Sequence, residues 1–237
     1  QRKSISSFRN EKEIVINLNF VLGNIRSSPY VGIFCSLTEE LGIVPQAALP
    51  KEVKLLEKEL DINIVKTNLG ETSLTGILST GLGNKIVVSN IAIEEEIKKL
   101  EKEGLEIMIL EGMTSTGNLL ALNANGGVAS SLIEEKSIKK MEEFFKIKIE
   151  TMRIADNDVP GASVTVTNKG FICHPNISEK DFSTLEKIFG VKGMATTANY
   201  GDLFVGNSVI ANTNGVMTGS LTSGIELGKI DEGMRGE

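Results

Sequence analysis

The stretch from Gly161 to Phe189 reads Gly-Ala-Ser-Val-Thr-Val-Thr-Asn-Lys-Gly-Phe-Ile-Cys-His-Pro-Asn-Ile-Ser-Glu-Lys-Asp-Phe-Ser-Thr-Leu-Glu-Lys-Ile-Phe. Two β-rich runs flank Asn168-Lys169-Gly170, which is typical of a hairpin turn because Asn and Gly tolerate positive φ. Ser178, followed three residues later by Asp181, marks a helix N-terminus. Apolar residues three and four apart then predict a helix over 179–189. The stretch therefore predicts a strand, a turn, a second strand and a helix.

The same plan recurs along the chain at intervals of about 44 residues. Glycines separated by 44, 41, 44 and 45 residues open the repeats near positions 32, 76, 117, 161 and 206: they are Gly32, Gly76, Gly117, Gly161 and Gly206. The positions 21, 24 and 28 residues after each glycine are apolar in 14 of 15 cases. Because these offsets mark one face of an α-helix, the first four repeats predict amphipathic helices over 51–60, 93–103, 135–145 and 179–189.

A third strand is predicted after each of the first three helices, over 62–66, 106–109 and 147–150. A unit of this length buries too little apolar surface to fold alone, so the five units are expected to share one core, stacked or closed in a ring. Closure would also remove exposed sheet edges. The fifth unit lacks its third strand, and the segment Ile14–Phe20 is predicted to supply it.

These patterns predict one domain over residues 14–230. Residues 1–13 are expected to form a flexible tail and hold four basic residues. We interpret that tail as a disordered segment, a basic arm that touches RNA, or sequence added for expression. A second flexible tail is expected at 231–237.

Composition limits the classes of function. Of the 237 residues, 41% are hydrophobic and 24% charged, which is ordinary for a globular protein, and the net charge is −6. An acidic chain is a poor general binder of DNA or RNA, because affinity for phosphates comes mainly from Lys and Arg. No apolar run approaches 18 residues, and the N-terminus lacks a secretory signal. We therefore expect a cytoplasmic protein without a membrane partner.

Side chains that carry chemistry are few. His174 is the single histidine, and the two cysteines are Cys35 and Cys173. Adjacent residues of a strand point to opposite faces, so Cys173 and His174 are a poor nucleophile–base pair. We interpret both cysteines as core residues and His174 as a loop anchor. Zinc-ligand spacing, glycine-rich phosphate loops and nucleophile elbows are absent from the sequence, which favours a binding protein without catalytic, metal or cofactor sites.

Several strings, taken with the fivefold repeat, resemble the translation initiation factor 6 family of archaea and eukaryotes. They are Pro29–Phe34 (PYVGIF), Thr116–Asn118 (TGN), Val166–Pro175 (VTNKGFICHP), Ala195–Gly201 (ATTANYG) and Gly206–Asn212 (GNSVIAN). The likeness extends from about Asn17 to Leu227. It implies the α/β pentein fold, a five-bladed α/β propeller with pseudo-fivefold symmetry.

The resemblance also implies a function. Members of the family bind the large (50S) ribosomal subunit near the sarcin–ricin loop of its RNA and the ribosomal proteins of the L14 and L24 families. Bound there, they sterically block the small subunit. We expect the same of this chain, as a monomeric, non-enzymatic factor in translation initiation or large-subunit biogenesis. The acidic charge fits basic ribosomal proteins as partners.

The contact face of the family lies just after the repeat glycines and near the C-terminus. By resemblance, the predicted contacts are Asn118, Asn207, Thr222, Ser223, Glu226, Ile77 and Ser163. Asn118 and Asn207 match the family's Gly-Asn pattern, and Asn118 is the first candidate. Thr222, Ser223 and Glu226 resemble a Thr-Thr-Gly-Pro-Glu segment in which Ile225 replaces proline. Ile77 and Ser163 are assigned equivalent places although their side chains differ from those of the family.

The alternative is a guanidine-modifying enzyme, because other penteins are arginine deiminases and amidinotransferases. Such enzymes need a nucleophilic cysteine late in the chain, a histidine and paired carboxylates around the central channel. No cysteine follows Cys173, which disfavours this reading.

The C-terminal end of the chain also departs from the family pattern. The glycines at 228, 233 and 236 argue against the family's C-terminal helix.

Overall fold

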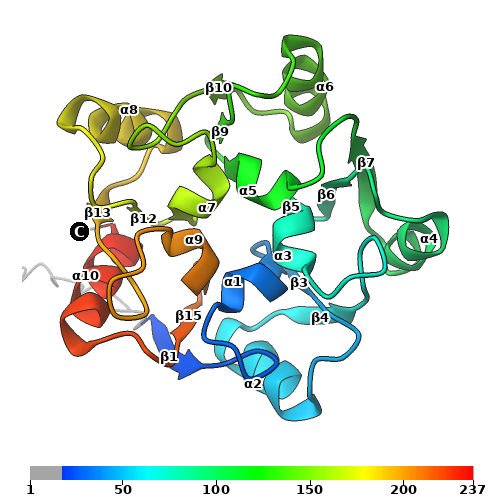
Figure 1. Cartoon of the computed structure of the whole chain (residues 1–237), viewed down its shortest axis with the longest axis horizontal. Coiled ribbons are helices and arrows are strands. Elements are labelled where there is room, and N and C mark those ends of the chain that lie inside the picture. The colour runs from blue at the N-terminus through cyan, green and yellow to red at the C-terminus, as the bar shows by residue number, and fades with distance from the viewer. Residues whose placement is uncertain (1–17, 237) are drawn as a thin grey trace, which may run out of the picture.

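The computed structural model describes residues 18–236 and places five three-stranded sheets around a central axis (Figure 1). We number the units 1 to 5 by their repeat glycines. In units 1 to 4 the first two strands pair antiparallel and the third strand pairs parallel to the second. Their strands are β2 (Ser36–Leu37), β3 (Leu41–Val44) and β4 (Asn63–Lys66); β5 (Ser79–Leu82), β6 (Lys85–Ser89) and β7 (Glu106–Leu110); β8 (Leu120–Leu122), β9 (Gly127–Ala129) and β10 (Ile149–Thr151); β11 (Val164–Val166), β12 (Phe171–Cys173) and β13 (Gly193–Ala195).

The fifth sheet combines the two ends of the chain. Its first two strands are β14 (Val209–Ala211) and β15 (Gly215–Gly219), and its third is β1 (Asn19–Gly23), which pairs parallel to β15. The N-terminal strand therefore completes the fifth sheet, as predicted. It lies at 19–23 instead of 14–20, and residues 14–17 fall outside the described part of the chain, as does the tail expected at 1–13.

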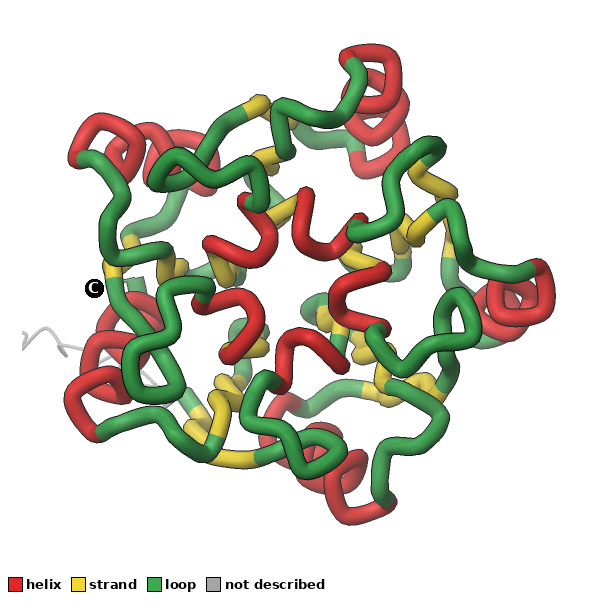
Figure 2. The backbone as a smooth tube through the Cα atoms, viewed as in Figure 1, coloured by secondary structure: helices red, strands yellow, loops and turns green. Residues whose placement is uncertain are grey.

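Long helices lie on the outer rim of the disc (Figure 2), and residues 18–236 contain five of them. They are α2 (Pro50–Leu60), α4 (Glu94–Lys102), α6 (Glu135–Phe145), α8 (Glu179–Phe189) and α10 (Gly224–Arg235). The first four agree with the predicted ranges to within one residue. Their apolar faces fill five core clusters, each shared by two neighbouring units; one joins Val128 of unit 3 to Phe171 and Phe189 of unit 4. Within residues 18–236, no helix has both the length and the apolar character needed to cross a membrane.

The C-terminal tail predicted at 231–237 is wrong for residues 231–235, which belong to α10. Gly233 packs against unit 4 so closely that a Cβ atom there would lie 2.8 Å from Ile172 and from Met194. Met234 is buried, and Gly236 ends the helix with φ +70°. The glycines that weaken the helix by propensity are therefore used for close packing and for a left-handed cap.

A ring of five one-turn helices surrounds the axis (Figure 2), where the sequence predicted strands beginning at the repeat glycines. These helices are α1 (Val31–Phe34), α3 (Thr75–Leu78), α5 (Thr116–Leu119), α7 (Pro160–Ser163) and α9 (Val205–Ser208). Each contains its repeat glycine as the second residue. One turn is too short to show a helical period in the sequence, so the pattern could not reveal it.

The repeat glycines touch one another around this ring. A Cβ atom on any of them would overlap the carbonyl oxygen of the glycine in the preceding unit, and the first glycine, Gly32, meets the last, Gly206. Glycine is thus required at each position because backbones meet where a side chain would lie. The cycle of contacts closes the ring, and the predicted α/β architecture with pseudo-fivefold symmetry is confirmed.

Candidate binding face and central channel

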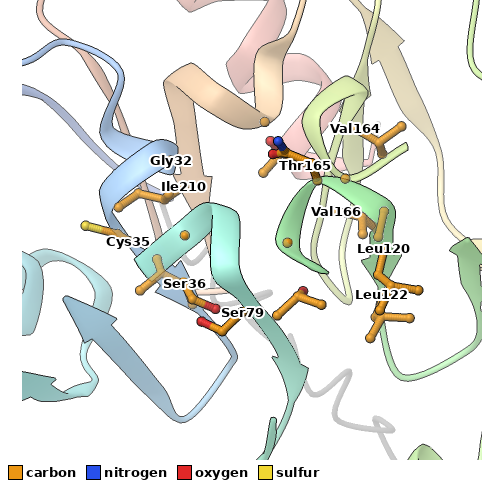
Figure 3. A pocket seen from close by; sticks show the side chains of 18 of the residues that line it. Gly32, Cys35, Ser36, Ser79, Leu120, Leu122, Val164, Thr165, Val166 and Ile210 are labelled. Carbon is orange, nitrogen blue, oxygen red and sulfur yellow. The ribbon is translucent and has the colours of Figure 1, made fainter. Parts of the chain in front are cut away.

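The axis of the ring contains a cavity of about 100 Å³ (Figure 3). The five repeat glycines line it together with side chains from the first strand of each unit, including Ser36, Ser79 and Thr165. Among the described residues that line this channel, none is charged and none is histidine.

The two cysteines are buried. Cys35 lines the channel, where burial, and to a smaller degree the Glu52 carboxylate, raises the pKa of its thiol. Burial raises the pKa of Cys173 to about 12. Both thiols are therefore protonated at neutral pH and are poor nucleophiles. The interpretation of both as core residues is confirmed.

His174 is a loop anchor, as expected. Its Nδ1 atom accepts a hydrogen bond from the backbone N–H of Asn176 at 3.2 Å, and its ring makes a T-shaped contact with the ring of Phe204. Burial lowers the pKa of His174, opposed by the nearby Asp202 carboxylate. Within residues 18–236, no three His, Cys, Asp or Glu side chains are grouped so that they could hold a metal ion.

Three predicted contacts follow the repeat glycines on the inner ring: Ile77 on α3, Asn118 on α5 and Asn207 on α9 (Figure 1). All three are half-buried. The side-chain amides of Asn118 and Asn207 make no hydrogen bond to other described residues. Their donors and acceptors are therefore available to a partner, and Asn118 also lines the channel.

Ser163 does not share this position. It is the fourth residue of α7, whereas Ile77 is the third residue of α3, so the two are not equivalent. Ser163 is buried, and its hydroxyl donates to the carbonyl of Val159 at 2.9 Å. Successive residues of a helix point in directions about 100° apart, which explains why a shift of one residue turns the side chain inward. The assignment of Ser163 to the same place as Ile77 is wrong.

The Glu226 carboxylate at the start of α10 is buried and surrounded by donors. Its Oε1 accepts from the Thr197 hydroxyl at 2.7 Å and the Gly201 N–H at 2.8 Å. Its Oε2 accepts from the N–H and hydroxyl of Ser223, both at 2.8 Å, and from the Tyr200 N–H at 3.1 Å. Burial alone would raise the pKa, but the hydrogen bonds from Thr197, Ser223 and Gly201 outweigh it and hold the pKa at about 2. The carboxylate therefore fixes the 197–201 loop onto α10.

Thr222 is also buried and supports the same loop. Its hydroxyl accepts from the backbone N–H of Asn199 at 3.1 Å. The Asn199 side chain donates to Ser208 at 2.9 Å and to the Pro29 carbonyl at 2.8 Å. Asn199 thereby links the rim at α10 to α9 of the inner ring. The predicted cluster of Thr222, Ser223 and Glu226 is thus brought together as a support for the loop.

The side chain that this loop presents to solvent is Tyr200, which is 84% exposed. Prediction from sequence did not single it out. A signal was present in Asn199-Tyr200-Gly201, because all three residues have positive φ and such a turn favours Asn and Gly.

In units 1 and 2, as in unit 5, the third residue of the long helix is a glutamate whose carboxylate accepts hydrogen bonds from the backbone of a loop. We call this arrangement a carboxylate lock. The Glu52 carboxylate accepts from the backbone N–H of Arg26 at 3.0 Å. The Glu96 carboxylate accepts from two successive N–H groups, at residues 70 and 71, at 2.7 and 2.9 Å. The equivalents in units 3 and 4 are Ser137 and Asp181, and neither accepts a hydrogen bond from its loop among the described contacts. Three units therefore have a loop held by a carboxylate, and two do not.

Glu39 links three hairpins beside the channel, where it lines a small cavity together with the channel residues Leu37, Gly81 and Leu122. Its carboxylate accepts from the N–H of Asn168 at 3.2 Å and from the N–H and hydroxyl of Thr213, both at 2.8 Å. It therefore joins the hairpins of units 1, 4 and 5.

Comparison with known proteins gives a consistent result across nearly the whole chain. A model of the eIF-6 family matches residues 21–233. The chain is 28% identical over 212 residues to translation initiation factor 6 of Methanosarcina mazei, covering 89% of this chain and 96% of that protein. It is 28% identical over 218 residues to the factor of Thermococcus onnurineus, with the same coverage, and 31% identical over 212 residues to that of Methanobrevibacter smithii, with 89% and 95% coverage.

Two solved structures that match are enzymes of low sequence identity. A crystal structure of dimethylarginine dimethylaminohydrolase bound to S-methyl-L-thiocitrulline matches with a TM-score of 0.44 and 14% identity, over 87% of this chain and 73% of that one. The enzyme from Pseudomonas aeruginosa in complex with citrulline matches with a TM-score of 0.39 and 16% identity, at the same coverage.

Proposed function

The chain belongs to the eIF-6 family, and on that basis we propose that it binds the large ribosomal subunit and sterically prevents the small subunit from joining it. The observation that carries the proposal is the inner ring, where Asn118 and Asn207 present side-chain amides that have no partner in the described part of the chain. Unpaired polar groups on a rigid ring are suited to recognising a fixed partner without large ordering costs.

The proposed partners are the sarcin–ricin loop of the large-subunit RNA and the ribosomal proteins of the L14 and L24 families. The net charge of −6 supports partners whose docking surface is rich in basic side chains, because complementary charge speeds the encounter of two proteins. The protein acts as a monomer in the cytoplasm. It does not catalyse a reaction, a proposal supported by the protonated thiols of Cys35 and Cys173 and by the uncharged channel.

Sedimentation through sucrose gradients with separated ribosomal subunits tests this proposal. We expect the protein to travel with large subunits, to be absent from small subunits, and to reduce the yield of whole ribosomes when both subunits are mixed. Protein that remains at the top of the gradient at low salt, or that travels with whole ribosomes, would contradict it.

A role in assembly of the large subunit is a refinement of the same proposal. It predicts that depletion of the protein arrests maturation of large subunits before their joining is affected. Normal levels of mature large subunits after depletion would restrict the protein to anti-association.

A further inference from the structure

One corner of unit 5 is apolar on its exposed surface. Tyr200 and Ile225 are 84% and 80% exposed, and they are the most exposed large apolar side chains in residues 18–236. They line the same open cavity of about 270 Å³, together with Lys229 and the hydroxyl side chains of Thr197 and Ser223. We call Tyr200, Ile225 and Lys229 the unit 5 corner.

The other units show that these apolar side chains are a local departure. Ile225 is the second residue of its long helix, and the residues at that place in units 1 to 4 are all charged: Lys51, Glu95, Lys136 and Lys180. Tyr200 is the second residue with positive φ in its turn, and the residues at that place in units 1, 2 and 4 are polar: Ser27, Glu71 and Asp156. Two neighbouring surface positions of unit 5 are therefore apolar where the compared units have charged or polar residues. Adjacent exposed apolar groups of this kind are typical of an interaction site.

The corner is held rigidly. Hydrogen bonds fix the turn that carries Tyr200. The backbone N–H groups of Tyr200 and Gly201 donate to the Glu226 carboxylate, and the Asn199 side chain donates to the Ser208 hydroxyl. A tyrosine on a fixed turn loses little conformational freedom when a partner covers it, which is the property of the aromatic anchors that dominate interfaces.

The charged group of the corner that is free to pair with a ligand is a cation, Lys229. The Lys229 ammonium makes no ion pair or hydrogen bond to other described residues, whereas the Glu226 carboxylate is already saturated by internal donors. This sign is opposite to the net charge of −6. The hydroxyls of Thr197 and Ser223 donate to Glu226, so neither hydroxyl is free to donate to the edge of a nucleobase.

We propose that the unit 5 corner is a docking site for a partner protein segment in which an apolar side chain stands beside a carboxylate. The apolar side chain would lie between Tyr200 and Ile225, and the carboxylate would pair with Lys229. This partner differs in charge from the basic ribosomal proteins of the proposed function, and Ile225 and Lys229 lie on α10 of the rim and not on the inner ring.

The test uses two synthetic peptides that differ only in charge, acetyl-Gly-Ser-Glu-Phe-Glu-Ser-Gly-amide and the same peptide with lysine at both glutamate positions. Binding to the full chain is followed by NMR of the Ile225 methyl group and the Tyr200 ring. We expect the acidic peptide to shift both signals and to bind at least about fivefold more tightly than the basic one, as expected for one added charge pair. Equal binding, no binding at millimolar peptide, or tighter binding of oligo-uridine would overturn the proposal.

Variants locate the site. Ile225→Gln, which removes the apolar side chain without changing the charge, should weaken the acidic peptide at least about tenfold, a loss usual for a hot-spot side chain. Lys229→Glu should reverse the preference between the two peptides. The control is Leu132→Gln, at a leucine of unit 3 that is 58% exposed, and it should change neither. In the sucrose gradient, Ile225→Gln should still travel with large subunits, and loss of that binding would show that the corner belongs to the ribosome-binding surface instead.

Discussion

The five repeats are alike on the inner ring of this disc and differ from one another on its outer rim. On the ring every unit is alike, because each repeat glycine presses its backbone onto the glycine before it. On the rim the units differ: a glutamate locks the loop in units 1, 2 and 5, while Ser137 and Asp181 stand at that place in units 3 and 4.

The difference shows where the repeat is free to vary. Closing a ring of five units through backbone contacts leaves no room for a side chain, so the requirement for glycine is the same in each unit. A loop on the rim is held by side chains, as Glu226 and Asn199 hold the loop of unit 5, so its contacts can differ from one unit to the next. Specific recognition is therefore expected where units differ, or where the common ring presents different side chains after the glycine.

The largest effect is expected from a change in the ring. Gly117→Ala places a methyl group on the carbonyl oxygen of Gly76, and neither backbone can retreat without opening the ring. We expect a loss of at least about 4 kcal/mol in the free energy of unfolding, or failure to fold. Urea denaturation followed by circular dichroism measures it. A loss below about 1 kcal/mol would show that the ring contacts are loose.

A change in a rim lock should cost less. Glu226→Gln places an amide group among donors that hold the carboxylate, and we expect a loss of about 2 kcal/mol at pH 7. Asp181→Asn, in a unit without a lock, is the matched control and should change stability by under about 0.5 kcal/mol. Equal losses for the two variants would contradict the lock.

The lock also predicts a dependence on pH. The pKa of Glu226 is about 2, below the ordinary value of 4.5, so the folded state favours the ionised form. Its stabilisation is therefore complete above about pH 5 and is lost as the pH falls toward 2. The difference in unfolding free energy between the wild type and Glu226→Gln should shrink over that range. If this difference in unfolding free energy stays constant down to pH 2, the loss in Glu226→Gln comes from packing and not from the charge of the carboxylate.

A change after the ring glycine should affect binding more than stability. Asn118→Ala removes an amide that has no internal partner, so we expect about tenfold weaker binding to the large subunit and little change in Tm. Asn63→Ala on the exposed edge of β4 is the control and should leave binding unchanged. Retained binding by the Asn118 variant would remove this residue from the face.

The smallest effect should be a gain. Gly228 lies inside α10, and a Cβ atom there would meet nothing within 4 Å. Gly228→Ala should therefore stabilise the fold by about 0.5–1 kcal/mol in the same urea assay, because alanine favours the helix. A loss of stability would contradict the prediction, because it would mean that a methyl group at residue 228 meets neighbouring atoms.

The elements with a regular period were predictable from sequence, and those made by close contact were not. The helix at 179–189 was predicted to the residue, because its cap at Ser178 and its apolar stripe are local features. The one-turn helices and the end of α10 were missed, because a single turn has no period and Gly233 is explained only by the strands it touches.

The candidate site divides in the same way. Asn118 and Asn207 were named by sequence and lie on the ring with free amides. Glu226 was named as a surface contact, yet its carboxylate is turned inward onto the loop, and Tyr200 was not named at all. Which way a side chain points depends on neighbours far away in the chain, so local pattern could not decide it.

The sequence by itself determined the five units, their long helices and the need for a strand from the N-terminus, because glycine spacing and apolar period are properties of a chain read in order. Only the tertiary structure decided that the repeat glycines meet in a closed cycle, that Ser163 is buried while Asn118 is available, and that Glu226 serves a loop. The physical reason is that contact distances and side-chain directions are fixed by residues that come together only when the ring closes.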